Sequence, residues 1–348
     1  MVKKLTFSAA IAVGCLLSAA PLAAETLVVG NWDGYMPPDL LENFAKEQGI
    51  EVEFTPHATN EEIMGKFMTN RGEGYDVVFL SSPFAQALNK LGLVAELDHA
   101  MIPNLANYYE EARALPHDPG NRYSAPYSWG TTGLCYREDL VEGTPDSWND
   151  LLDPSPANKG KVTMLQTDRW LMQPALFMLG YSVNETDPEK LAEARDLLIK
   201  AKEGLLAYDD TTFYSKLVSG EAVLVQGWDG WCNYGIAETD QIKFILPKEG
   251  ADLWVDTMII PAASENKELA HAFIDYVLRP DVHSWVASNI LYKVPNEAAM
   301  AEVDPALIET FPNLGMTPEE LMKLELVEDL GEGQRAFTRS VQEVLSAN

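Results

Sequence analysis

The sequence has few cysteines, few histidines and few basic residues, and each shortage narrows the functions that fit it. Three cysteines and five histidines are scattered over 348 residues, and their spacing matches no metal site. The 53 acidic residues outnumber the 25 lysines and arginines, which gives a net charge of −28. This charge repels nucleic acid and attracts cations, although it also serves solubility in a salty habitat. We expect no metal, no cofactor and no nucleic-acid partner.

The short motifs of common enzyme classes are also missing. The sequence contains no Gly-x-Ser-x-Gly elbow, His-Glu-x-x-His helix, phosphate-binding glycine loop or Gly-x-Gly-x-x-Gly fingerprint. We therefore predict that the protein is not an enzyme. A secreted glycosidase needs two opposed carboxylates beside aromatic platforms, and the many acidic residues leave that alternative open.

Long apolar runs are confined to the first residues of the chain. Lys3 and Lys4 precede the mostly apolar run 5–20, and small residues follow it. This order is typical of a secretory signal, so we assign residues 1–24 to a cleaved signal peptide. Cys15 lies in that run, and the residues before it fit a lipoprotein site poorly. No later stretch approaches the roughly 20 apolar residues of a membrane helix, which predicts a soluble mature chain.

Predicted strands alternate with amphipathic helices along the mature chain. The apolar runs 26–30 and 75–80 indicate strands that are covered on both faces, and helices follow them. A second set of strands is predicted at 162–165, 222–226 and 242–246. This alternation predicts an α/β fold with mainly parallel sheets flanked by helices.

The chain is long enough for two lobes, because single cores stop growing at about 250–300 residues. We assign residues 25–132 and 257–305 to lobe one, and residues 133–256 and 306–348 to lobe two. The chain would then cross between the lobes more than once, and such crossings form a hinge with a cleft between the lobes.

Two cysteines, Cys135 and Cys232, remain after removal of the signal peptide. A secreted chain permits a disulfide between them. Their pairing stays open at this point, because it depends on whether the fold brings the two positions together.

Aromatic, acidic and hydroxyl side chains follow the predicted strands. Ligands of open parallel sheets bind at the carboxyl ends of the strands. The candidate residues are Trp32, Asp33, Tyr35, Ser81, Ser82, Trp228, Asp229, Trp231, Trp254 and Asp256. A carboxylate compensates the charge of a desolvated ammonium, and each aromatic face attracts the cation by roughly 0.5–2 kcal/mol. We predict a box of Trp32, Trp228 and Trp254, with Asp256 on one wall, that binds a small organic cation.

Several segments also occur in the order found in one family of transport receptors. They are Asn31–Pro38, Tyr75–Val78, Tyr127–Gly130, Leu179–Ser182, Pro247–Gly250, Trp254–Asp256, Leu278–Val282, Tyr292 and Val294–Asn296. Through them the chain resembles the spermidine/putrescine-binding family of periplasmic ABC-transport receptors. The resemblance implies a two-lobed periplasmic-binding-protein fold with a hinged cleft that closes on a polyamine. It also implies a periplasmic location and an inner-membrane ABC permease as partner, and we expect a monomer.

The resemblance implies roles for single residues as well. The aromatic walls around the methylene chain would be Trp32, Trp228 and Trp254, and the polar contacts would be Tyr35, Ser81 and Tyr292. Asp256 would hold an amine. The second amine site departs from the family pattern, because uncharged residues stand where acids or a glutamine are usual. These residues are Gly34, Thr167, Trp170, Trp231 and Val327.

Two interpretations of the altered end follow. Either Asp33, Asp168 or Asp229 turns in to hold a second amine, or the ligand has one cationic head, such as a methylated ammonium of the choline or betaine type. In the second case Trp170 and Trp231 make that end more aromatic. Arg169 is a candidate partner for a ligand carboxylate, although a salt bridge within lobe two is its simpler role.

Other binding proteins remain alternatives. Sugar receptors also stack their ligands on tryptophan, and ferric receptors of similar architecture use paired tyrosines such as Tyr108 and Tyr109. This tyrosine pair lies outside the predicted strand-end loops, which favours a packing role for it.

Overall fold

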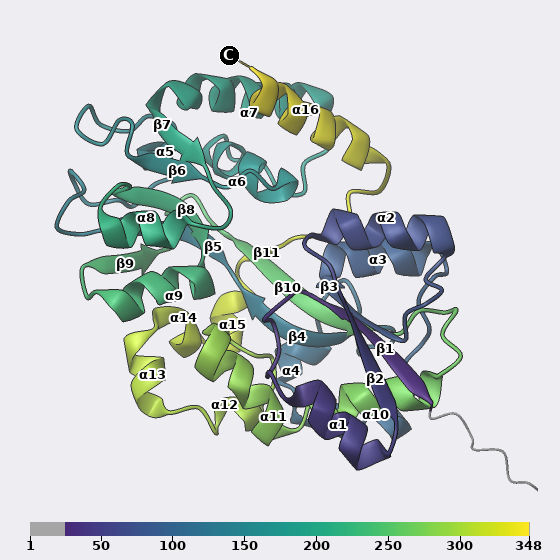
Figure 1. Ribbon diagram of the computed structural model, residues 1–348. Coiled ribbons are helices and arrows are strands. Elements are labelled where there is room, and N and C mark those ends of the chain that lie inside the picture. The colour runs from purple at the N-terminus through teal and green to yellow at the C-terminus, as the bar shows by residue number, and fades with distance from the viewer. Residues whose placement is uncertain (1–24, 348) are drawn as a thin grey trace, which may run out of the picture.

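The computed structural model describes residues 25–347 and shows two groups of strands and helices stacked on each other (Figure 1). The predicted signal peptide, residues 1–24, lies outside the described residues. Within 25–347, no helix has both the length and the apolar character that a bilayer crossing requires.

Six strands form the first sheet. They are β1 (Thr26–Asn31), β2 (Glu51–Pro56), β3 (Val77–Ser81), β4 (Ala125–Gly130), β10 (Asp252–Ile259) and β11 (Glu325–Leu326). Their order is β11-β10-β3-β1-β2, and β4 pairs with β10. β1 is parallel to β2 and β3, whereas β10 is antiparallel to both β3 and β4. The predicted α/β class is confirmed, with a mixed sheet in place of a mainly parallel one.

Five strands form the second sheet. They are β5 (Thr132–Arg137), β6 (Val162–Met164), β7 (Leu205–Tyr208), β8 (Leu224–Trp228) and β9 (Ile242–Ile245), in the order β7-β6-β8-β5-β9. β6 is parallel to β7 and β8, and β5 is antiparallel to β8 and β9. This sheet is therefore also mixed.

Helices cover both faces of the first sheet because alternate strand residues point to opposite faces. Phe79 of β3 joins a core with Phe44 of α1 (Leu40–Gln48) and Phe273 of α10 (Lys267–Val277). Its neighbour Leu80 joins a separate core with Phe67 of α2 (Asn60–Asn70) and Leu88 of α3 (Ser82–Lys90). A strand buried on both faces reads as a continuous apolar run, as β3 does.

The second sheet is packed in the same way. Its larger helices are α6 (Asp168–Met178), α7 (Pro188–Ala201), α8 (Phe213–Ser219), α9 (Asp229–Glu238) and the last helix α16 (Gln334–Ser346). α16 packs on α7 and α6, so the C-terminal end of the chain lies against the second sheet (Figure 1). Within the segment 306–348 that we assigned to lobe two, α16 therefore lies with the second sheet, whereas β11 pairs with β10 of the first sheet.

Short helices complete the described chain. The short α-helices are α4 (Glu110–Arg113), α5 (Asn149–Leu152), α11 (Pro280–Trp285), α12 (Glu297–Met300), α13 (Pro305–Thr310), α14 (Pro312–Gly315) and α15 (Pro318–Leu321). The remaining turns are 3-10 helices at His99–Met101, Pro103–Asn107, Lys202–Gly204 and Gly331–Gly333, and a π-helix at Val286–Ile290. α13 packs against α14, below the second sheet in the view of Figure 1.

We call the first sheet with its helices lobe one, and the second sheet with its helices lobe two. The chain crosses between them at Thr131, in 246–251 and after β11. Our boundary at residue 256 falls inside β10, a strand of the first sheet. The sequence predicts a loop at 254–256, because turn residues precede this segment and Asp256 interrupts its apolar residues.

Candidate functional site

Asp256 lies in the interior of β10 and accepts two hydroxyl hydrogen bonds. Ser81 Oγ donates to Oδ1 over 2.7 Å, and the Tyr35 hydroxyl donates to Oδ2 over 2.8 Å. The strand register places Asp256 between Ser81 on β3 and Ser128 on β4. Sheet pairing therefore assembles this group from distant parts of the chain, instead of the strand-end loop that we expected for Asp256.

Three further residues hold these two donors in place. Tyr35 and Ser128 share a hydrogen bond of 2.8 Å between their hydroxyls, and the Tyr127 hydroxyl donates to the Tyr35 carbonyl over 2.7 Å. Asn60 Nδ2 donates to Ser81 Oγ, and the Ser81 backbone N–H donates back to Asn60 Oδ1. Sequence reasoning missed these supporting residues, although Tyr127 and Ser128 lie in a segment that carries the family resemblance.

The environment of Asp256 suits a positively charged ligand group. Burial raises the pKa of its carboxyl from 3.8 to about 6, although the hydrogen bonds from Ser81 and Tyr35 act in the opposite direction. Burial and then the Asp256 charge raise the pKa of Tyr35 well above 10, so this hydroxyl stays neutral. No lysine, arginine or histidine of residues 25–347 forms an ion pair with Asp256.

A chain of aromatic rings from lobe one surrounds this carboxylate. Trp254 and Tyr292 meet edge to face at 4.8 Å, Tyr292 lies 6.1 Å from Tyr35, and Tyr35 lies 5.4 Å from Trp32. Trp254 and Asp256 are two residues apart on β10, so their side chains share one face of the sheet. The structure thus brings together five of the predicted site residues on lobe one, besides Ser81.

Lobe two contributes a second aromatic group. Trp228 ends β8 and is half-buried, and Trp170 of α6 meets it edge to face at 5.6 Å. Phe213 lies 6.4 Å from Trp228 and 6.1 Å from Trp231 of α9. Tyr214 also packs against Trp231. Trp231 is therefore part of an aromatic cluster within lobe two, behind Trp228.

The start of α9 is where the two lobes touch beside these aromatic rings. A Cβ atom at Gly230 would fall less than 3.0 Å from the ring of Tyr292, and a Cβ atom at Gly130 would fall equally close to Trp254 and Asp229. Only glycine allows these approaches. The first turn of α9 therefore rests directly on the aromatic rings of lobe one.

Asp229 is hydrogen-bonded to the crossing between the two lobes. Its buried carboxylate accepts the backbone N–H of Thr131 over 3.1 Å and that of Gly230 over 2.7 Å. Thr131 is the crossing residue between β4 and β5. Burial raises the pKa of Asp229 from 3.8 to about 8, despite these hydrogen bonds.

Three other candidates do not join the Asp256 group. Asp33 is exposed in the loop after β1, and Ser82 is fully buried in the first turn of α3. Asp168 accepts a hydrogen bond of 2.8 Å from Thr338 Oγ1 on α16. The loop and helix starts that carry them do follow strands, but Asp33 is exposed, Asp168 bonds to α16, and the buried Ser82 Oγ has no hydrogen-bond partner among residues 25–347.

Arg169 serves the third crossing between the lobes. Its Nη1 donates to the Glu328 carbonyl over 2.6 Å, and its Nη2 donates to Asn184 Oδ1 over 2.6 Å. It forms no salt bridge with any residue of 25–347, so the expected ion pair is absent. The guanidinium instead holds the segment that connects β11 to α16.

Asp252 is a buried acid that sequence reasoning missed. Its carboxylate accepts the Thr132 backbone N–H over 2.8 Å, Trp170 Nε1 over 2.9 Å and Gln173 Nε2 over 2.9 Å. The Thr132 hydroxyl adds a fourth, longer hydrogen bond of 3.3 Å. Burial raises the pKa of Asp252 to about 6. Trp170 therefore uses its indole N–H on an acid of the protein.

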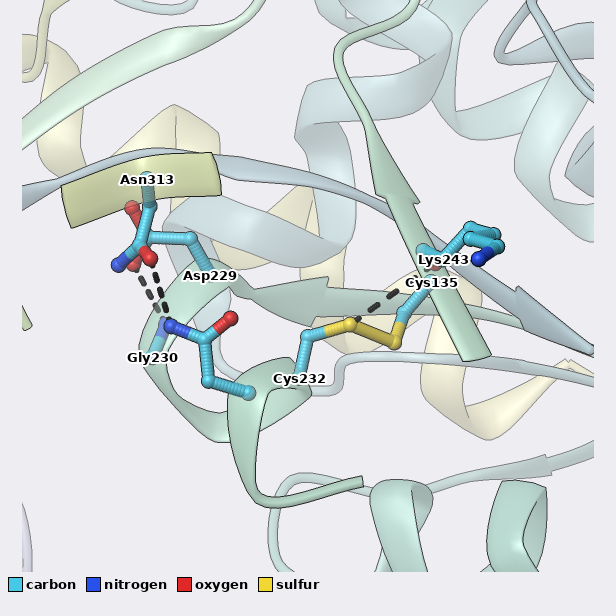
Figure 2. The surroundings of a disulfide bond; sticks show 7 residues. Cys135, Asp229, Gly230, Cys232, Lys243 and Asn313 are labelled. Atoms are coloured by element: carbon cyan, nitrogen blue, oxygen red, sulfur yellow. Dashed lines mark hydrogen bonds between the residues drawn. A yellow bond between two sulfur atoms is a disulfide. The ribbon is translucent and has the colours of Figure 1, made fainter. Parts of the chain in front are cut away.

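Cys135 of β5 and Cys232 of α9 form a disulfide, which answers the question that the sequence left open (Figure 2). Asp229 and Gly230 lie close to this bond at the start of α9. The disulfide therefore fixes to the second sheet the helix that touches lobe one.

The alternatives with a metal find no support in the described chain. Residues 25–347 contain no cluster of histidine, cysteine, aspartate or glutamate that could hold an ion. Tyr108 donates to the Pro126 carbonyl over 2.5 Å, while Tyr109 stacks on Trp129 at 6.1 Å. The two tyrosines therefore pack separately, as expected for a packing role.

Comparisons with known proteins agree with this architecture. A family model described as bacterial extracellular solute-binding protein matches residues 39–304. The chain belongs to this family. It is 35% identical over 282 residues to the spermidine/putrescine-binding periplasmic protein of Escherichia coli K12, which covers 81% of this chain and 80% of that protein. It is 32% identical over 346 residues to the putrescine/cadaverine-binding protein of Pseudomonas aeruginosa, covering 96% of each.

Solved structures also superpose on most of this chain. A putative spermidine/putrescine ABC transporter from Listeria monocytogenes has a TM-score of 0.84 and 28% identity, and the match covers 93% of this chain and 99% of that one. A GABA receptor named Atu4243 has a TM-score of 0.73 at 19% identity, which shows the fold alone. The resemblance and the two-lobed periplasmic-binding-protein fold are confirmed.

Proposed function

We propose that this protein is the periplasmic receptor of an ABC importer and captures a polyamine or a related organic amine between its two lobes. The observation that carries the proposal is Asp256, a carboxylate that accepts from two neutral hydroxyls inside a ring of aromatic side chains. The relatives named for spermidine and putrescine support the same ligand class. The partner would be an inner-membrane permease, and the receptor would act as a monomer after cleavage of residues 1–24.

The ammonium group of the ligand replaces water at Asp256. A buried ammonium needs a carboxylate to compensate its charge, and the hydroxyls of Ser81 and Tyr35 keep the carboxylate oriented. The methylene groups of the ligand then contact Trp254 and Tyr292. Aromatic faces attract both the cation and the adjoining methylenes.

Closure of the lobes completes the site. Trp228 and the start of α9 come from lobe two, whereas Asp256 comes from lobe one. A ligand that contacts both sides favours the closed form over the open form by its extra contacts. The permease then recognises the closed form.

Calorimetric titration with putrescine and spermidine tests the proposal. We expect Asp256→Ala to weaken binding at least tenfold, or about 1.4 kcal/mol, because it leaves a buried cation without a counter-charge. Asp33→Ala is the matched control, because Asp33 is exposed and lies outside the Asp256 network, and its affinity should match wild type. Unchanged affinity in Asp256→Ala would disprove the assignment. A thermal-shift screen that found stabilisation by a sugar and by no amine would disprove the ligand class.

A further inference from the structure

One face of β10 carries two carboxylates in different environments. Asp252, Trp254 and Asp256 alternate along the strand, so their side chains lie on the same face. The two acids are four residues apart, which separates them by about 13 Å at the usual rise of a strand. A ligand with its ammonium at Asp256 that extends along Trp254 therefore runs toward Asp252.

Asp252 has no oxygen left for a second ammonium. It is fully buried and accepts four hydrogen bonds, two of them from Trp170 Nε1 and Gln173 Nε2 of α6. Asp229, the other nearby acid, is also buried and accepts two backbone N–H groups. Asp256 differs from both, because it is half-buried and accepts only two hydroxyls.

The aromatic wall that lobe two contributes is uncharged. It consists of Trp170 and Trp228, which meet at 5.6 Å, with Phe213 behind them. A second ammonium against this wall loses its water without gaining a carboxylate, which is costly. An alkyl or capped end gains there by burying apolar surface, at roughly 25 cal/mol per Å².

We propose that this receptor selects amines with a single positive charge, and that Trp170 is the residue that sets this selectivity. Trp170 acts in two ways, since it covers Asp252 and supplies apolar surface where the far end of the ligand lies. The ligand class is an alkylamine whose far end is uncharged, such as a monoacetylated diamine. This inference rests on the proposed function and concerns the same site.

A competing position for a second ammonium exists at the edge between the lobes. Glu61 lies at the start of α2 in lobe one, whereas Asp168 and Asp210 belong to lobe two. Desolvation raises the pKa of Glu61, and the negative charges of Asp168 and Asp210 raise it further. Asp168 and Asp210 are already hydrogen-bonded, by Thr338 and Thr167 respectively. The test therefore has to distinguish a diamine that places its second ammonium at this edge from an amine with an uncharged far end.

The test compares ligands of matched chain length on the mature wild-type protein. Calorimetry is performed with putrescine, N-acetylputrescine and n-butylamine. We expect the two singly charged amines to bind at least tenfold more tightly than putrescine. If putrescine binds as tightly or more tightly, the inference is wrong while the proposed function stands, and loss of that binding in Glu61→Gln would place its second amine at the edge. If none of the amines binds, the proposed function itself fails.

Variants of Trp170 test its role. Trp170→Glu places a carboxylate in the far wall, so the preference should reverse toward putrescine by at least tenfold relative to wild type. Trp170→Phe keeps an uncharged ring and should keep the wild-type preference. A folded Trp170→Glu protein with the wild-type order of affinities would overturn the role of Trp170. If Trp170→Glu does not fold, the wild-type titration with matched ligands still decides the selectivity.

Discussion

At the residue scale, Asp256 owes its surroundings to the pairing of β10 with two other strands. Its hydrogen-bond partners Ser81 and Tyr35 lie 175 and 221 positions away in the sequence. Both are hydroxyl donors, so they orient the carboxylate without neutralising its charge. The charge therefore remains available to a cation.

Removal of one donor should change both the affinity and its pH dependence. Tyr35→Phe deletes the hydrogen bond to Asp256, which lowers the carboxyl pKa in wild type. We expect amine affinity at neutral pH to fall by about tenfold, within the range of a hydrogen bond to a charged group. The pH below which binding is lost should also move upward from about 6. Calorimetry across this pH range measures both effects.

The control for this variant is Tyr276→Phe on α10, which removes a hydroxyl outside the site. Its affinity and pH dependence should match those of wild type. An unchanged pH dependence in Tyr35→Phe would contradict the role of Tyr35 as a partner of the ionised carboxylate.

The sequence predicted residues that lie around Asp256, but it did not show which other acids form hydrogen bonds within the protein. Tyr35, Ser81, Trp254 and Tyr292 were expected from the resemblance, and the structure groups them beside Asp256. Asp252, Asp229 and Asp168 differ from Asp256 in their hydrogen-bond partners, and the first two also in being fully buried. Those partners come from other elements, so no local pattern in the sequence distinguishes a free carboxylate from a saturated one.

At the element scale, the start of α9 has three tasks within four residues. It supplies the hinge contact of Asp229, the close approach of Gly230 to lobe one, and Cys232 of the disulfide. The adjacent Trp228 ends β8. A small movement of this helix start would therefore disturb the hinge and the aromatic wall together.

Removal of the disulfide should lower the free energy of unfolding. The bond joins positions 97 residues apart, and loops of this size contribute about 2–4 kcal/mol to the free energy of unfolding in most proteins. We expect the double variant Cys135→Ser/Cys232→Ser to lose stability of this order in urea unfolding. Reduction of the wild-type protein should lower stability equally. Equal stability of oxidised and reduced protein would contradict this prediction.

The elements predicted best were those with a continuous apolar pattern. β1 and β3 were expected close to their observed bounds, because they are buried on both faces. β10 was missed as a strand between 252 and 256, because two aspartates interrupt its apolar residues. Both aspartates are tolerated there by hydrogen bonds that only the assembled sheet provides.

At the scale of the whole molecule, closure depends on how near lobe two can approach lobe one. Gly230→Ala adds a methyl group that would overlap the Tyr292 ring of lobe one. Alanine favours a helix over glycine, so lobe two itself should fold normally. We expect amine affinity to fall at least tenfold, with loss of the ligand-induced decrease in the radius of gyration measured by small-angle X-ray scattering.

Gly235→Ala is the matched control in the same helix. Its Cβ atom would approach Cδ1 of Ile242 to 3.0 Å, and this contact lies within lobe two at the end of a flexible side chain. Ligand binding and compaction should remain as in wild type. Wild-type affinity in Gly230→Ala would show that the close contact between Gly230 and Tyr292 is not needed for ligand binding.

The buried acids should make the stability of the ligand-free protein depend on pH, and acidic pH should weaken its ligand binding. Burial raises the folded-state pKa of Asp256 and Asp252 from 3.8 to about 6, and that of Asp229 to about 8. These three acids contribute stability that is lost as pH rises through these values. Burial lowers the pKa of His57, His117 and His283 from 6.5 to about 4, so these histidines contribute stability that is lost as pH falls below about 6.5. The amine needs ionised Asp256, so its affinity should rise with pH.

Thermal unfolding at about pH 5 and about pH 8 checks this prediction through its linkage relation. Asp229→Asn should raise the ligand-free melting temperature more at about pH 8 than at about pH 5, because it removes a buried acid whose pKa is raised to about 8. The increase in melting temperature caused by an amine should be larger at the higher pH. An Asp229→Asn variant with the same difference from wild type at both pH values would contradict the prediction.

The central place of β10 in the first sheet has a consequence for how the newly made chain assembles. β5 to β9 are consecutive in the sequence, so lobe two has all its strands before β10 is synthesised. β3 has to wait for β10, its neighbour across the sheet. Until then the apolar edge of β3 is unpaired, and such edges pair readily with other chains. Lobe one is therefore the part of the newborn protein that most needs protection from aggregation.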